Sequence, residues 1–295
     1  MPSLARALPR PSVAMTRLGR RRAERTRWSP LTVVLCGVLL LVVVPCLFAP
    51  LVAPFDPSAL SATRFAGPSL HHLFGTDELG RDLASRILYG GRLTVLICAG
   101  ATAIAMVLGA IWGMVAAYFR GLLDEILMRI ADAAMAIPQI LFALVFVAAF
   151  GANAVRLAVI VGILLTPTTA RLVRSATLVE TQSDYFSAAI AYGAPRYALL
   201  AREVFPNLRA PLAVQAAINA ANAVILEAAL SFVGLGIQPP EASLGSLVRQ
   251  GYDQIYQSVT YVLFPTVIIF VVIWMLTLLA DQLSGGEASR GVNGG

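Results

Sequence analysis

Lysine is absent from this chain of 295 residues, and all 22 of its basic residues are arginine. A phosphate-binding loop of the GxxxxGK type requires a lysine, so the chain cannot hold ATP in that way. Charged residues make up only 13% of the sequence, whereas soluble domains carry about 25%. Hydrophobic residues reach 58%, and the mean hydropathy is +0.77. These values indicate a membrane protein.

Histidine and cysteine are also scarce, with two and three residues respectively. Cys36, Cys46 and Cys98 lie in apolar runs, which is typical of small hydrophobic side chains rather than of a disulfide framework. A metal site at His71 and His72 is the alternative for the loop that holds them, but adjacent histidines do not share a helix face. We therefore predict no catalytic residue and no metal site, and a membrane enzyme is the least favoured class.

The first 30 residues carry eight arginines and one acid, Glu24. A basic tail directly before an apolar run is typical of a cytoplasmic anchor, because positive charge is retained inside. A nucleic-acid-binding arm is a less economical interpretation, and no nucleic-acid partner is expected. A cleaved signal peptide is disfavoured because the following apolar run is too long for a signal core.

Long apolar runs predict six membrane spans. The first has no charge over 25 positions, enough at 1.5 Å per residue to cross a core of about 30 Å, and Pro45 is expected to kink it. The fourth is the weakest, since Arg156 and Arg171 must both snorkel to the interfaces. The expected spans are Leu31–Phe55, Leu93–Phe119, Ala133–Val155, about Asn153–Val173, Ala210 to about Leu235, and Val259–Ala280.

Charge balance between the spans supports a cytoplasmic N-terminus. The loop after the first span has four acids against Arg64 and Arg81, whereas residues 171–209 have five arginines against three acids. Basic loops are retained in the cytoplasm, so residues 171–209 are placed inside and the first loop outside. Six crossings then return the C-terminus to the cytoplasm.

A mixed polar and apolar segment, residues 183–207, separates the fourth and fifth spans. Ser183 or Asp184 is expected to cap a short helix that stops at Gly193, where a glycine tolerates the left-handed conformation. A second short helix is expected to end at Pro206, with the residue before that proline outside the helical region. Such a unit is too short to cross a bilayer.

The first external loop contains the run HLFGTDELGRD. Two glycines frame an acidic turn, and Thr76 or Asp77 is expected to cap a short amphipathic helix that carries Leu83, Ile87 and Leu88 on one side. The residues of this external motif are His72, Gly75, Thr76, Asp77, Gly80, Arg81 and Asp82.

Few charges lie near the membrane interior. Asp132 and Asp281 are close enough to span ends to be boundary residues, whereas Glu227 lies about 26 Å along its helix, near the outer interface. Glu227 either braces the external turn GLGIQPP or contacts substrate or a binding protein. Pro138 and Pro167 are expected to bend their helices. Glu227 and Pro138 are the candidates for the substrate path.

Four motifs in order resemble the second permease subunit of dipeptide and oligopeptide ABC importers. They are the HLFGTDELGRD loop, DEILMRIADAAMAIP (124–138), the stretch from ARLVR to PN (170–207), and EAALSFVGLGIQPP (227–240). The resemblance covers roughly residues 56–280. It implies an all-α polytopic membrane protein of six spans, like the type I ABC importer permeases, with a cytoplasmic coupling helix between spans four and five.

The resemblance also implies that residues 183–207 dock into a groove on an ATPase subunit. Ser187 and Glu203 differ from the residues usual in the family, whereas Gly193 matches its central glycine. A helix lying on lipid headgroups is the other interpretation of this segment. The expected docking residues are Tyr185, Ser187, Ala188, Ala189, Gly193, Arg196, Arg202, Pro206 and Asn207.

The organisation expected is a basic cytoplasmic tail (1–30), a first span (31–55), an extracytoplasmic loop (56–91), a five-helix permease core (92–281) that includes the docking loop, and a flexible tail (282–295). The resemblance implies a bacterial inner-membrane peptide importer with a second permease, two ATPase subunits or domains that hold ATP and Mg²⁺, and an extracytoplasmic binding protein. No cofactor is expected on this chain. A nickel or glutathione importer is the nearest alternative, and a secondary transporter ranks lower because buried acids are scarce.

Overall fold

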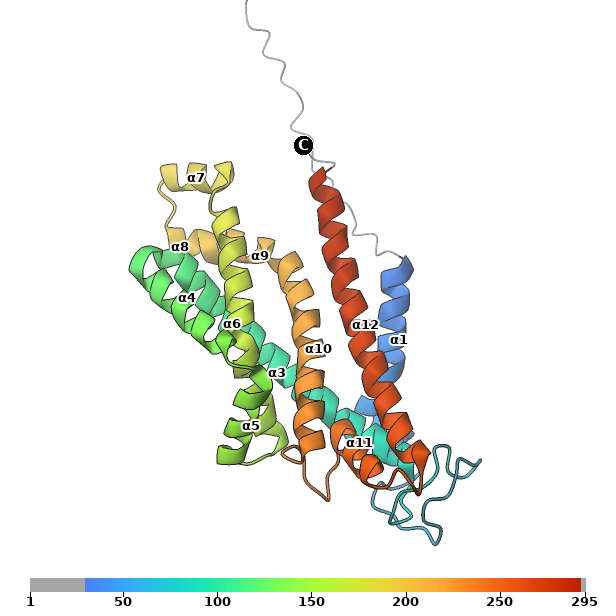
Figure 1. The fold of residues 1–295 in the computed structure, drawn as a ribbon. Helices are drawn as coiled ribbons and strands as arrows, with labels where there is room; N and C mark the ends of the chain where they lie inside the picture. The colour runs from blue at the N-terminus through green and yellow to red at the C-terminus, as the bar shows by residue number, and fades with distance from the viewer. Residues whose placement is uncertain (1–29, 293–295) are drawn as a thin grey trace, which may run out of the picture.

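A computed structural model describes residues 30–292, and within that range the backbone forms helices and no named β-strand (Figure 1). The side chains of Arg196 and of residues 285–292 lie outside the described part. The helices in chain order are α1 (Pro30–Leu47), α2 (Ala49–Val52), α3 (Leu83–Phe119), α4 (Gly121–Ala136), α5 (Gln139–Phe150), α6 (Ala154–Glu180), α7 (Asp184–Ala191), α8 (Arg196–Leu199), the π-helical turn η1 (Leu200–Val204), α9 (Phe205–Asn207), α10 (Arg209–Val233), α11 (Leu244–Asp253) and α12 (Val259–Val292).

Five of these helices, α1, α3, α6, α10 and α12, are long and apolar enough to cross a membrane, and the bent pair α4–α5 makes a sixth crossing if it counts as one span. The start of α1 and the end of α12 lie at the same end of the bundle as α7 (Figure 1). The loop after α2 and helix α11 lie at the opposite end. We refer to these as the α7 end and the α11 end.

The first span is shorter than predicted. Helix α1 stops at Leu47, Phe48 leaves the helical region with φ −94° and ψ 26°, and α2 adds a single turn that ends at Val52. Pro45 lies inside α1, and Pro50 is in the first turn of α2, where its missing N–H is not needed. The predicted continuous helix to Phe55 is therefore wrong, because two prolines fall within six residues.

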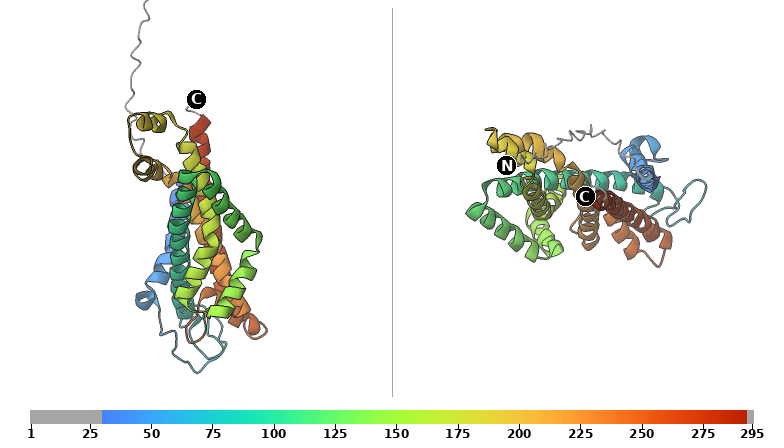
Figure 2. Two further views of the ribbon diagram at one scale, coloured as in Figure 1. Left: turned by 90° about the vertical axis from the view of Figure 1, so that its left-hand side faces the viewer. Right: turned by 90° about the horizontal axis from the view of Figure 1, so that it is seen from above.

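Helix α3 begins ten residues earlier than predicted and reaches 37 residues, about 56 Å, well beyond a core of about 30 Å. The short amphipathic helix that was predicted to be separate forms the first turns of α3. Asp82, and not Thr76 or Asp77, is the N-cap, accepting a hydrogen bond from the Ser85 amide at 2.8 Å. Seen from above, α3 runs across the molecule with α1 near one end and α4 near the other (Figure 2).

The third span is not one straight helix. Helices α4 and α5 meet at an angle of 87°, with Ile137 and Pro138 in extended conformations between them. The bend at Pro138 was predicted, but a single span over 133–155 was not correct. The residue before a proline avoids the helical region, which accounts for the break at this point.

Helices α6, α10 and α12 lie where the last three spans were predicted, but α6 continues to Glu180 and α12 to Val292. Helix α12 therefore extends into the residues that were predicted as a flexible tail (282–295). Pro167 lies inside α6. Helix α11 was not predicted. Its signal was the capping box of Ser243 and Ser246, in which each side chain bonds the backbone of the other residue. Between α10 and α6, the Asn219 amide donates to the Thr169 hydroxyl at 2.8 Å. A hydrogen bond of this kind joins helices where water is absent.

The most extensive helix contact in the described chain is between α3 and α6. A Cβ added at Gly113 of α3 would lie 2.4 Å from the Ala170 carbonyl oxygen, and one at Gly109 would lie 2.5 Å from the Thr169 Cβ. On α6, a Cβ at Gly162 would lie 2.9 Å from the Ala101 carbonyl oxygen. The two backbones therefore touch at positions where only glycine fits, which is how membrane helices pack tightly without a hydrophobic driving force.

We predict that Gly113→Ala lowers the stability of the folded protein by about 1–3 kcal/mol, because the added methyl group overpacks the contact between α3 and α6. The midpoint of thermal unfolding in detergent measures this. Gly37→Ala on α1 is the matched control, since no atom lies within 4 Å of its added Cβ. Equal midpoints for the two variants would contradict the packing described here.

Candidate functional site

The segment predicted to dock a partner lies at the α7 end, where α7 extends past the start of α10 (Figure 1). Helix α7 begins after Ser183 and closes at Gly193, which has φ +86° with no atom within 4 Å of an added Cβ. The predicted glycine stop is confirmed. Ser183 occupies the N-cap position but forms no side-chain cap, because its hydroxyl donates to the Glu180 carbonyl instead.

Pro206 does not end the second helix, which corrects the prediction. The chain widens into the π-helical turn η1, in which the Phe205 amide donates to the Leu200 carbonyl five residues earlier. Phe205 keeps helical angles of −56° and −44°, and Pro206 falls in the first turn of α9, where its missing N–H costs little. A continuous helical path therefore leads from α8 into α10.

One face of the segment is anchored to the bundle. Phe186 and the η1 residues Leu200 and Val204 are buried against Val173 of α6 and Ala110 of α3, and Ala189 packs partly buried beside them. The predicted docking residue Ala189 therefore faces its own chain. Movement of this segment has to move the ends of α3 and α6 with it, because the contact is well packed.

Two further docking candidates also hold the segment in place. The Tyr185 hydroxyl donates to the Glu180 carboxylate at 2.8 Å, and the Asn207 amide lies 3.4 Å from both groups. Burial, together with the hydrogen bond to Glu180, raises the pKa of the Tyr185 phenol. The phenol therefore remains a donor at neutral pH.

The opposite face of the segment is open. Tyr192 is 92% exposed and Tyr197 is 68% exposed, and these rings give large contact areas of the kind enriched at protein interfaces. Most of the predicted docking residues are exposed, although the structure describes no side chain for Arg196. The exposed candidates are Ser187, Ala188, Gly193, Arg202, Pro206 and Asn207.

Two ion pairs tie α4 to α6 near the α7 end. The Arg174 guanidinium donates to both Asp124 carboxylate oxygens, at 2.5 and 2.6 Å, and Arg171 pairs with Asp132. Bidentate pairs fix geometry as well as charge. Asp132 and Arg171 were predicted as separate boundary residues, and the pairing between them was missed because their helices are adjacent only in the fold.

At the α11 end, the external motif folds into a tight turn. Gly75 and Gly80 frame it as predicted, with positive φ angles. Thr76 and Asp82 pair through their backbones as an isolated antiparallel β-bridge. Asp77 is fully buried and accepts hydrogen bonds from the amides of Leu79 and Arg81, both at 2.8 Å. His72 lies 2.9 Å from an Asp82 oxygen. These residues share one compact unit, and among the described residues no group of three potential ligands could hold a metal ion.

Arg86 connects this turn to the helices, and sequence reasoning missed it. Its guanidinium is 4% exposed and donates to Asp77 at 2.5 Å, to the Tyr261 hydroxyl at 3.0 Å and to Gln250 at 2.9 Å. The available signal was an arginine only three residues after Leu83, inside a largely apolar run that also contains Arg92. Arg86 joins the loop to α11 and α12, because a buried guanidinium has to be paired.

Glu227 braces the fold. It is fully buried, and its carboxylate accepts from the Ser231 hydroxyl at 2.7 Å and from Thr94 at 3.2 Å. Thr94 in turn accepts from the Leu244 amide at the start of α11. Of the two roles considered for Glu227, the geometry favours bracing the turn between α10 and α11 over contact with substrate.

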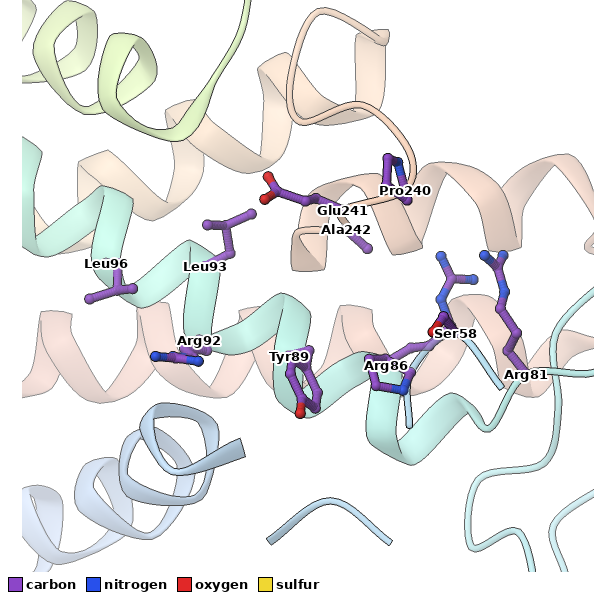
Figure 3. Close-up of a pocket in the computed structure, with 11 residues that line it drawn as sticks. Ser58, Arg81, Arg86, Tyr89, Arg92, Leu93, Leu96, Pro240, Glu241 and Ala242 are labelled. Atoms are coloured by element: carbon purple, nitrogen blue, oxygen red, sulfur yellow. The ribbon is translucent and has the colours of Figure 1, made fainter. Parts of the chain in front are cut away.

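A cavity of about 370 Å³ opens beside these groups at the α11 end (Figure 3). Its wall combines the first turns of α3, the loop after α2 and the turn before α11. Apolar side chains such as Leu93 and Leu96 line one part of it. The polar lining residues are Ser58, Arg81, Arg86, Tyr89, Arg92 and Glu241.

Comparison with known proteins gives a consistent picture. Residues 105–285 match the family model described as binding-protein-dependent transport system inner membrane component. A peptide transport system permease protein of Brucella suis is 39% identical over 264 residues, which covers 89% of this chain and 88% of that protein. The di/tripeptide transport system permease protein of Pseudomonas aeruginosa is 34% identical over 252 residues, 83% of each chain.

Among solved structures, an inward-facing methionine ABC transporter chain superposes with a TM-score of 0.57 at 18% sequence identity. The match covers 68% of this chain and 95% of that chain. At this identity the likeness concerns the fold, which is that of an ABC transporter permease.

We predict that Arg86→Met destabilises the protein by about 2–3 kcal/mol, since it removes one charge-assisted hydrogen bond from the buried Asp77 carboxylate, which keeps its pair with Arg81. Thermal unfolding in detergent measures the loss. Arg64→Met in the same loop is the matched control, because Arg64 is exposed and forms no hydrogen bond or ion pair with a described residue. An unchanged midpoint for Arg86→Met would refute the role of Arg86 as a structural tie.

Proposed function

Since the chain belongs to the family of binding-protein-dependent transport system inner membrane components, we propose that it is the permease subunit of an ATP-driven importer of short peptides. It is a multi-pass membrane protein. The relatives named for peptide and di/tripeptide transport, which align over most of both chains, support the substrate class. A bacterial inner membrane with both termini in the cytoplasm agrees with the arginine distribution.

The proposal rests on one observation. Helices α7 and α8 expose residues such as Tyr192 and Tyr197, whereas the other face of the same segment is packed against α3 and α6. The chain has no lysine for a phosphate-binding loop, so it performs no ATP hydrolysis of that kind and has to receive its energy from outside. We assign that task to two ATPase subunits or domains holding ATP and Mg²⁺, with Ala188, Tyr192 and Gly193 at the contact. A second permease and an extracytoplasmic binding protein complete the importer.

The coupling follows from the packing. A displacement of α7 acts on α6, because Phe186 packs on Val173 and Glu180 at the end of α6 bonds Tyr185. Helix α6 holds α4 through the Asp124–Arg174 pair, and α4 leads directly to the bend at Pro138. By this route, ATP binding can shift the bundle between inward and outward access. The shift requires that the ATPases contact the segment from α7 to α9 differently in the two states.

The function is tested by uptake of radiolabelled dialanine into proteoliposomes that contain the complete importer. We expect accumulation that requires ATP and the binding protein. Uptake driven by a proton or sodium gradient without the ATPases would instead establish a secondary transporter. Stronger uptake of glutathione or of nickel than of dialanine would favour the alternative substrates.

We predict that Ala188→Arg lowers copurification of the ATPase subunits and peptide-stimulated ATP hydrolysis at least about tenfold, since a long charged side chain on the exposed face blocks a close contact. Ala62→Arg is the matched control, because Ala62 is an exposed alanine in the loop at the α11 end. Normal assembly of Ala188→Arg would contradict the docking assignment.

A further inference from the structure

Two of the charged side chains that line the cavity at the α11 end form no ion pair with another described residue. Arg81 and Arg86 both donate to Asp77, at 2.6 and 2.5 Å, and Arg81 also reaches Glu78 at 3.2 Å. Two guanidiniums and two carboxylates therefore balance. Arg92 and Glu241 line the same cavity, and no hydrogen bond or ion pair joins the side chain of either one to another described residue.

Arg92 is the tenth residue of α3, about 14 Å along the helix from its first residue. It is on a membrane-spanning helix, at nearly the same position as Thr94, which bonds Glu227 of α10. Its side chain is exposed, so an anionic ligand in the cavity can reach the guanidinium. Glu241 follows Pro240 in the turn before α11 and lines the cavity from that turn (Figure 3).

We propose that this cavity binds the zwitterionic form of a short peptide, with the terminal carboxylate on Arg92 and the terminal ammonium on Glu241. The inference rests on the proposed function and specifies where the chain meets its substrate. One free cation and one free anion match the two charges of an unblocked peptide. The volume of about 370 Å³ falls in the range of small-molecule sites, and the apolar wall of Leu93 and Leu96 suits side chains.

A phospholipid with a phosphate and an ammonium group, such as phosphatidylethanolamine, presents the same pair of charges. The cavity favours a peptide because its polar groups surround a bounded volume between three segments of the chain instead of lying along one exposed helix face. The Tyr89 hydroxyl and the unpaired Nη1 of Arg81 supply further donors for a carboxylate.

The test is uptake of radiolabelled dialanine below saturation by the complete importer in proteoliposomes. Arg92→Gln and Glu241→Gln are each expected to lower the uptake rate about tenfold, the effect of one charge-assisted hydrogen bond, with ATPase assembly unchanged. Arg92→Lys keeps the charge and is expected to retain most of the rate. Arg129→Gln, at a 78% exposed side chain on α4, is the control and is expected to behave as the wild type.

Each alternative outcome is distinct. Wild-type rates for both Arg92→Gln and Glu241→Gln would overturn the site while leaving the importer function intact, whereas a wild type without ATP-dependent uptake would contradict the function itself. Equal losses in Arg92→Lys and Arg92→Gln would show that shape and not charge matters, and would also overturn the proposal. A defect that disappears when phosphatidylethanolamine is replaced by phosphatidylglycerol would assign the cavity to the lipid headgroup.

Discussion

The close packing of α3 against α6 is the constraint on which the other parts of the molecule depend. Gly109, Gly113 and Gly162 let the two backbones touch, so the helices behave as one rigid pair over most of their length. At one end α3 carries Arg86 and the wall of the cavity. At the other end both helices support the cluster under α7. The pair thus connects the proposed ATPase contact with the proposed peptide site.

Charged side chains are few, and they either pair between helices and loops or lie exposed at one of the two ends of the bundle. The pair of Asp124 with Arg174 fixes α4 to α6, and the group around Asp77 and Arg86 fixes the loop after α2 to α11 and α12. Between these ends the helices are joined by neutral contacts such as Asn219 with Thr169. Two states of the bundle can therefore differ by movement of helices without separating charges in the membrane interior.

Much of the architecture could be predicted from the sequence, because long uncharged runs leave few options in a bilayer. The stop at Gly193 and the bend at Pro138 followed from backbone chemistry. Phe205 and Pro206 were misjudged because the π-helical turn η1, which no residue pattern signals, places the proline at a helix start. The break after Leu47 and the early start of α3 depend on local contacts that hydropathy does not register.

The polar partners could not be predicted, because they join residues far apart in the chain. Arg86 meets Gln250 and Tyr261, and Glu227 meets Thr94. The sequence did not single out Arg92, and only the folded structure shows that Arg92 and Glu241 line the same cavity. The docking residues were predicted from the resemblance, and the structure divides them into anchors such as Tyr185 and exposed positions such as Ala188.

The central claim is that the segment from α7 to α9 transmits the work of an ATPase through the α3–α6 pair. Amide hydrogen exchange of the permease in lipid nanodiscs, with and without the ATPase subunits, tests it most directly. The account predicts that the ATPases slow exchange of the amides at 187–193 in α7 and its glycine stop, and leave the external loop at 56–82 unchanged. Unaltered exchange at 187–193, with the ATPases bound elsewhere on the chain, would contradict it.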